Sequence, residues 1–146
     1  MICYLDTSAL VKIYIDEDGS AMVSDLVDKS SIISTSVVAY AEARAVFKRI
    51  KNEGLLKENH YSRLVANFKQ DWPNILSIKV SQPVISAVDI FADLYSLRGF
   101  DLIHLASTAA LSNKVNSKIV VGCWDKRLWE AYYVEGFTLY PKEPSW

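Results

Sequence analysis

Short apolar runs alternate with longer segments of helical spacing along this chain, and that alternation restricts the fold more than any other feature. The short runs are bounded by turn or capping residues, so we interpret them as strands at 2–5, 31–34, 75–80, 119–122 and 138–140. The segments between them predict helices over 9–14, 20–29, 37–51, 57–72, 83–95, 101–111 and 126–133. This order predicts an α/β fold, a mostly parallel five-stranded sheet with helices on both faces.

Composition limits the size and the setting of the protein. With 146 residues, 51% of them hydrophobic, we expect a single domain over residues 1–146 with a substantial core. The 16 basic and 17 acidic residues nearly cancel, so attraction to phosphates must come from local patches. No basic leader precedes an apolar segment and no apolar stretch reaches the ~20 residues of a membrane span, so we expect an unexported, cytoplasmic protein with no membrane partner.

Two acids follow predicted strands directly. In open parallel sheets the ligand site lies at the carboxyl ends of the strands, where the strand order reverses. Asp6 follows the first strand in LDTSALVK, and Asp125 follows the fourth in VVGCWDKRL. If the first and fourth strands are neighbours, both carboxylates face one crevice.

Two further acids occupy predicted helices. Glu42 interrupts the apolar run SVVAYAEARAV in the middle of a predicted helix, where a carboxylate is costly unless something compensates it. Asp101 opens DLIHLASTAAL, a segment that is apolar on nearly every side and therefore predicts a buried helix. As a set, the four acids suggest a site.

Each acid also has a purely structural interpretation. Asp6, Asp101 and Asp125 stand where helix caps are favoured, and Glu42 could form a buried ion pair with Arg44 or Arg98. On that interpretation the chain is a non-catalytic binding module. Replacing the capping acids with Ser or Asn would then preserve both fold and function.

Clustered carboxylates favour metal chemistry. They repel one another and take up protons unless a cation lies among them, and their hard oxygens suit Mg²⁺ or Mn²⁺, which can activate water and polarise a phosphodiester. The sequence contains no GxxxxGK[ST] loop, no GxGxxG after the first strand, no GxSxG and no HExxH. A phosphotransfer domain is the enzymatic alternative, but a DxDxT phosphatase needs an acid where this chain has Ser8.

Four segments resemble the VapC-like toxins of the PIN-domain nuclease family: LDTSALVK, VAYAEARAVFKR around Glu42, LRGFDLIHLASTAAL around Asp101, and VVGCWDKRLWEA followed by GFTLYP. The resemblance runs nearly end to end. It implies a three-layer Rossmann-like domain with strand order 3-2-1-4-5. It also implies an endoribonuclease dependent on Mg²⁺ or Mn²⁺ that cuts structured RNA such as tRNA or rRNA, blocks translation, commonly forms a homodimer, and is inhibited by a cognate antitoxin.

The resemblance also assigns roles to residues. Asp6, Glu42 and Asp101 correspond to the family's metal-binding acids, and Asp125 corresponds to its fourth acid. Ser8, with Thr7 beside it, matches a hydroxyl that supports the first acid. Many members have Thr or Ser two residues before the fourth acid, where this chain has Cys123, a weaker hydrogen-bond donor.

Basic residues near the acids are candidates for contacts with RNA phosphates: Lys12, Arg44, Arg98 and Lys126. The alternative is that they are solvated helix charges. His104 lies one turn after Asp101 among apolar neighbours, and we expect a packed core histidine rather than a catalytic base. Within the family, an RNA-processing nuclease without a toxin role is the alternative function.

Overall fold

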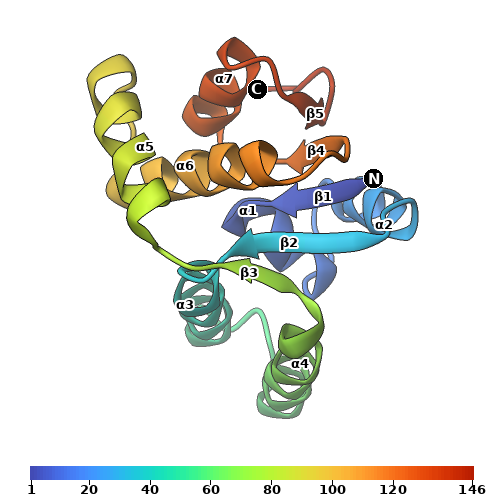
Figure 1. Ribbon diagram of the computed structural model, residues 1–146. Coiled ribbons are helices and arrows are strands. Elements are labelled where there is room, and N and C mark those ends of the chain that lie inside the picture. Colours follow the sequence, from blue (N-terminus) through green and yellow to red (C-terminus); the bar gives the residue numbers. More distant parts are fainter.

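The sheet consists of five parallel strands. The structure is a computed structural model that describes residues 1–146, and its strands are β1 (Ile2–Leu5), β2 (Ile32–Ser36), β3 (Leu76–Ile78), β4 (Ile119–Gly122) and β5 (Thr138–Tyr140). They are arranged in the order β3-β2-β1-β4-β5 (Figure 1). Both the α/β class and the strand order are therefore confirmed. β2 extends to Ser36, further than expected, because Thr35 and Ser36 pair with β3.

Helices connect successive strands: α1 (Thr7–Leu10), α2 (Ser20–Asp28), α3 (Ala39–Asn52), α4 (Glu58–Asp71), α5 (Gln82–Leu94), α6 (Gly99–Lys114) and α7 (Lys126–Val134). Two 3-10 turns, η1 (Val11–Ile13) and η2 (Trp72–Asn74), extend α1 and α4. The helix expected from residue 9 begins at Thr7, and the one expected from residue 101 begins at Gly99. None of these helices is both long and apolar enough to span a membrane.

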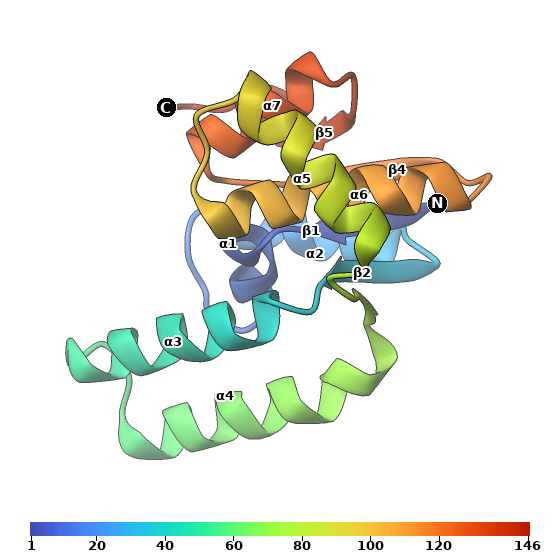
Figure 2. The same ribbon diagram turned by 60° about the vertical axis from the view of Figure 1, so that its left-hand side comes forward.

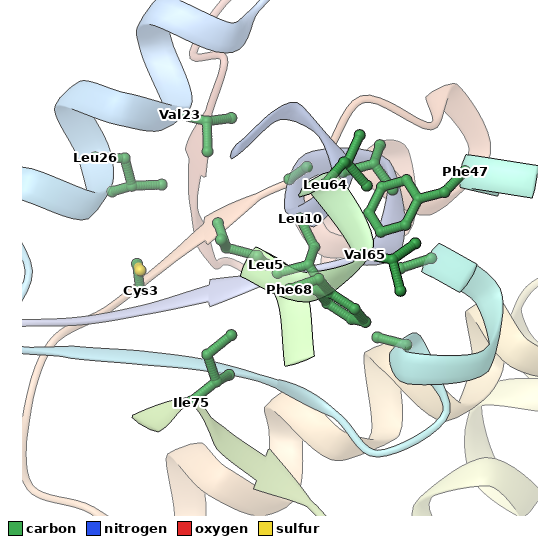
Figure 3. Packing of buried hydrophobic residues seen from close by; sticks show 14 of the residues in the cluster. Cys3, Leu5, Leu10, Val23, Leu26, Phe47, Leu64, Val65, Phe68 and Ile75 are labelled. Carbon is green, nitrogen blue, oxygen red and sulfur yellow. The ribbon is translucent and has the colours of Figure 1, made fainter. Parts of the chain in front are cut away.

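Alternate residues of each strand face opposite layers of helices, as the pleat of a strand requires. Cys3 and Leu5 of β1 pack into a core formed with α1 to α4, and Figure 3 shows part of this cluster. Ile2 and Tyr4 face the other way, into a core formed with α5 to α7. The sheet thus lies between two helical layers, which completes the expected three-layer arrangement.

Helices α3 and α4 form an antiparallel pair that extends away from the sheet (Figure 2). Aromatic side chains join them: Tyr40 stacks on Phe68 with ring centroids 5.1 Å apart, and Phe47 meets Phe68 edge to face at 5.4 Å. Such aromatic pairs stabilise packing beyond the area that they bury. The amphipathic segment predicted over 57–72 therefore turns its apolar side toward α3.

A glycine at the end of β4 allows α1 to approach the sheet. A Cβ atom at Gly122 would lie 2.8 Å from Cδ2 of Leu5, which would have to move, and 3.3 Å from Cβ of Ala9, so α1 would have to shift by a few tenths of an ångström. The amide of Asp6 donates to the carbonyl of Gly122 at 3.2 Å. The ends of β1 and β4 are therefore level, and the residues that follow them start side by side.

Candidate active site

All four acids singled out in the sequence line one cleft of about 740 Å³ at the carboxyl ends of the strands. Asp6 follows β1, Glu42 lies in the first turn of α3, Asp101 lies in the first turn of α6, and Asp125 precedes α7. Since β1 and β4 are neighbours at the position where the strand order reverses, Asp6 and Asp125 do face the same crevice. The cleft therefore brings together residues up to 119 positions apart.

Asp6 is the most deeply buried of the acids, with 3% of its surface exposed. It caps α1, because its Oδ1 accepts from the amide of Ala9 at 2.9 Å. The Ser8 hydroxyl donates to both carboxylate oxygens, at 2.7 and 2.8 Å. Burial raises the pKa of Asp6, and these hydrogen bonds together with His104 limit that rise. The capping interpretation is correct for Asp6, and it does not compete with a place in the site.

Ser8 and Cys123 join the end of β4 to Asp6. The amide of Trp124 donates to the Ser8 hydroxyl at 2.8 Å, and the Cys123 thiol donates to Oδ2 of Asp6 at 3.3 Å. Cys123 thus donates a hydrogen bond to Asp6 although it is a weaker donor than the Thr or Ser found here in many family members, and the distance is typical of a sulfur donor. Burial raises the pKa of Cys123 well above its ordinary value, so the group is a neutral thiol.

Glu42 is supported by a threonine and a histidine rather than by an arginine. Its Oε1 accepts from the Thr7 hydroxyl at 2.7 Å and lies 2.9 Å from Nε2 of His104. Burial acts to raise the pKa of Glu42, but the hydrogen bonds from His104 and Thr7 outweigh it, and the pKa is lowered. The suggested ion pairs with Arg44 or Arg98 do not form. The expectation that Glu42 lies mid-helix was wrong, because α3 begins only at Ala39.

His104 is a packed histidine, with 1% of its surface exposed. Its Nδ1 lies 2.9 Å from the hydroxyl of Tyr4, which is itself fully buried, and its Nε2 lies 3.1 Å from the Thr7 hydroxyl. The ring lies against one of the four acids, which the apolar neighbours of His104 in the sequence did not indicate.

Asp101 and Asp125 form the second side of the cleft, where the carboxylates have fewer hydrogen-bond donors. Burial and then the neighbouring charges of Asp125 and Asp6 raise the pKa of Asp101 to about 6. No protein group donates a hydrogen bond to the Asp101 carboxylate. Asp125 caps α7, since its Oδ1 accepts from the amide of Leu128 at 3.0 Å. The acids therefore repel one another, as expected for clustered carboxylates.

The basic residues divide into those that line the cleft and those that do not. Lys12 and Arg98 line it, whereas Arg44 and Lys126 lie outside it. Lys12 pairs with Glu17 at 2.9 Å and lies 5.3 Å from the centre of the Trp124 ring. Arg49, which was not among the predicted contacts, also lines the cleft, about two helical turns beyond Glu42. The exposed aromatic Phe100 lies at the rim next to Asp101.

The carboxylate oxygens match the donor chemistry of a hard divalent cation. Such a cation would also offset the charges of Asp125 and Asp6, which after burial are the main causes of the raised pKa of Asp101. No three acidic, imidazole or thiol side chains come close enough together to form a complete ion site. The acids surround the cleft and do not converge on a single point. The donor set fits Mg²⁺ or Mn²⁺ in chemistry.

A family model for the PIN domain matches residues 3–115, which include three of the four acids. The chain belongs to the PIN-domain family. This PIN domain is 28% identical to Ribonuclease VapC45 of Mycobacterium tuberculosis (strain CDC 1551 / Oshkosh) over 142 residues, which cover 97% of this chain and 96% of the relative. The resemblance inferred from the four sequence segments is therefore confirmed.

Solved structures share the fold of this PIN domain at low sequence identity. A toxin-antitoxin complex from Klebsiella pneumoniae matches with a TM-score of 0.59 and 16% identity, over 87% of this chain and 89% of the other. VapC20 of Mycobacterium tuberculosis, described as a Sarcin-Ricin loop cleaving toxin, matches with a TM-score of 0.63 and 12% identity, over 98% of this chain and 99% of the other. These matches support the three-layer architecture.

Proposed function

We propose that this PIN domain is an endoribonuclease dependent on Mg²⁺ or Mn²⁺ and that it acts as the cytoplasmic toxin of a toxin-antitoxin pair. The observation that carries the proposal is the convergence of Asp6, Glu42, Asp101 and Asp125 on one cleft at the switch point of the sheet. Helix capping explains the positions of Asp6 and Asp125, but it explains neither Glu42 nor the repelled Asp101.

The acids and the arginines of the cleft have different proposed roles. Asp6, Glu42 and Asp101 would hold the ion, in part through waters that Mg²⁺ keeps, since the three carboxylates do not meet at one point, and Asp125 would contribute at its edge. When bound, the ion would polarise the phosphodiester and supply an activated water, and no protein nucleophile is needed. Arg98 and Arg49 line the same cleft. Arg49 lies 3.9 Å from the Glu53 carboxylate in an exposed and therefore weak ion pair, so both guanidinium groups would be available to contact RNA phosphates.

A structured RNA such as tRNA or rRNA is the proposed substrate. The full-length similarity to a VapC ribonuclease supports RNA as the substrate class, and VapC20, which shares the fold, is described as cutting the sarcin-ricin loop. The exposed ring of Phe100 at the rim of the cleft offers a surface on which an unpaired base could stack.

The proposed protein partners are a cognate antitoxin and a second copy of the chain. A groove lined by Val37, Tyr40 and Trp72 between α3 and the end of α4 is apolar enough to receive an antitoxin segment. Ile85, Ile90 and Leu94 are exposed on α5, which suits a homodimer interface. Co-purification with the product of a neighbouring gene and the mass of the complex in solution would test both partners.

Cleavage of total RNA by the purified chain, with EDTA, Mg²⁺ or Mn²⁺, tests the proposed function. Wild type should cut only with metal, and Asp6→Asn should lose about a thousandfold in rate, the equivalent of several kcal/mol of charge stabilisation. Asp28→Asn, an equivalent change at an exposed position at the end of α2, is the matched control and should cut normally.

Circular dichroism must show that both variants are folded before their rates are compared. Cleavage that survives EDTA, or equal rates for Asp6→Asn and wild type, would contradict the four-acid site. A wild type that neither cuts RNA nor binds Mn²⁺ would instead favour the non-catalytic binding module.

A further inference from the structure

A chain of hydrogen-bonded side chains runs from the interior of the protein to Glu42. The Tyr4 hydroxyl lies 2.9 Å from Nδ1 of His104, and Nε2 of His104 lies 2.9 Å from Oε1 of Glu42. Tyr4 and His104 are both almost completely buried. The three residues come from β1, α6 and α3, so the chain joins three separate elements behind the cleft.

The Glu42 carboxylate determines which group donates in each of these two hydrogen bonds. A carboxylate only accepts hydrogen bonds, so the nitrogen that faces Glu42 must carry a proton. In a neutral imidazole the other nitrogen is then an acceptor, and the Tyr4 hydroxyl donates to it. The Tyr4 hydroxyl is therefore matched to the tautomer of His104 that donates to Glu42.

We propose that Tyr4 and His104 are positioning residues for Glu42, and this inference rests on the proposed metal-dependent function. Together with Thr7, they occupy Oε1 and fix the carboxylate, while Oε2 has no hydrogen-bond partner in the protein. Partners behind a metal ligand orient it and raise its affinity for the ion, and their loss costs about 10- to 100-fold in metal affinity. His104 thus acts through Glu42 and does not touch the substrate.

The alternative is that these hydrogen bonds only satisfy the polar groups of Tyr4 and His104, which are buried. A buried tyrosine and histidine must find partners whatever the cleft does, because an unpaired buried group is costly. That interpretation predicts a loss of folding stability when either residue is changed, with no effect on metal binding. The two interpretations therefore predict different Mn²⁺ affinities for variants of Tyr4 and His104.

A pair of amide substitutions separates them. The side-chain nitrogen of Gln lies near the position of Nε2 in His, whereas that of Asn lies near the position of Nδ1. His104→Gln therefore retains a donor toward Glu42, and His104→Asn removes it. We expect the Mn²⁺ dissociation constant of His104→Gln to stay within about threefold of wild type, and that of His104→Asn to rise by about 10- to 100-fold.

Mn²⁺ binding is measured by electron paramagnetic resonance of the free ion, at a temperature where circular dichroism shows both variants folded. Equal Mn²⁺ affinities in wild type, His104→Gln and His104→Asn would overturn the positioning role, as would equal weakening in both variants. If either variant does not fold, Tyr4→Phe, which removes one oxygen, replaces the pair and should weaken Mn²⁺ binding by about threefold or more.

The failure of this inference differs from the failure of the proposed function. If wild type binds Mn²⁺ and cuts RNA while the variants bind Mn²⁺ equally well, only the positioning role is wrong. If wild type neither binds Mn²⁺ nor cuts RNA, the metal-dependent function is wrong and the positioning role fails with it.

Discussion

The two sides of the cleft hold their carboxylates in different ways. On the side formed by β1 and α3, Asp6 accepts from Ser8, Cys123 and a helix amide, and Glu42 accepts from Thr7 and His104. On the side formed by the starts of α6 and α7, Asp125 accepts a single capping bond and Asp101 accepts none. Repulsion from Asp125 and Asp6 adds to the effect of burial on Asp101.

This difference indicates that one side of the cleft supports the fold and that the other side attracts a cation. The hydrogen-bonded side is part of the folded framework, because its acceptors satisfy donors that would otherwise be buried without partners. The other side keeps charge that the protein does not compensate, and such charge favours a cation. Substitutions on either side should therefore reduce activity, but only those on the hydrogen-bonded side should greatly reduce folding stability.

The largest expected effect tests whether the two sides act as one site. Asp6→Asn and Asp101→Asn should each reduce metal-dependent RNA cleavage about a thousandfold, and the double variant should be no slower than either single one, because groups that act as a unit are not additive. Rates are compared at saturating Mg²⁺ and again with excess Mn²⁺. A double variant slower by the product of the two single effects would indicate two independent sites.

The next effect is on folding stability. Asp6→Ala should lower the free energy of unfolding by about 2 to 3 kcal/mol, because it removes a helix cap and the carboxylate to which Ser8 and Cys123 donate. Asp125→Ala, which removes a cap with one hydrogen bond, is the matched comparison and should cost about 1 kcal/mol. Urea denaturation without metal measures both. Equal losses would mean that the two sides do not differ.

The smallest expected effect is an increase in folding stability, and it depends on pH. The pKa of Asp101 is about 6 in the folded chain against its ordinary value of 3.8, so the folded state binds more protons between these values and stability falls as pH rises through this window. Without metal, Asp101→Asn should therefore be more stable than wild type at pH 8, by about 1 kcal/mol once solvent screening of this half-exposed group is allowed for.

At pH 4 the stability advantage of Asp101→Asn should be nearly gone, because most of the wild-type carboxyl is then protonated. Added Mg²⁺ should reverse the order at pH 8, since only the wild type retains the full ligand set. Thermal melts at the two pH values, with and without Mg²⁺, measure these differences. A variant that is less stable than wild type at pH 8 without metal would show that the charge of Asp101 is compensated in the fold.

Much of the architecture followed from local pattern. The central strands β1 and β4 are short apolar runs that are buried at every position, as expected for a parallel sheet covered on both faces. The same logic brought Asp6 and Asp125 together once the first and fourth strands were paired. The boundaries shifted by one to three residues where pairing or capping decided them, as at Thr35 and Gly99.

The sequence could not supply the partners of Glu42. Arginines were considered because they are common partners of buried carboxylates, but the actual partners are Thr7 and His104, which lie 35 and 62 residues away along the chain. Which turn of α6 faces β1 depends on how that helix packs, and periodicity within α6 does not reveal it because most of its residues are apolar. The exclusion of Arg44 from the cleft and the inclusion of Arg49 depend in the same way on the rotation of α3.

The pairing of β1 with β4 also has a consequence for the timing of synthesis. The last acid follows β4, and the contacts from Trp124 and Cys123 to the first acid exist only when β4 has joined β1. A nascent chain that has emerged only as far as α6 would carry three of the acids with Asp6 incompletely held. Because such a distant pairing forms slowly, a growing chain would complete the four-acid cleft, and with it the proposed activity, only after most of its helices have formed.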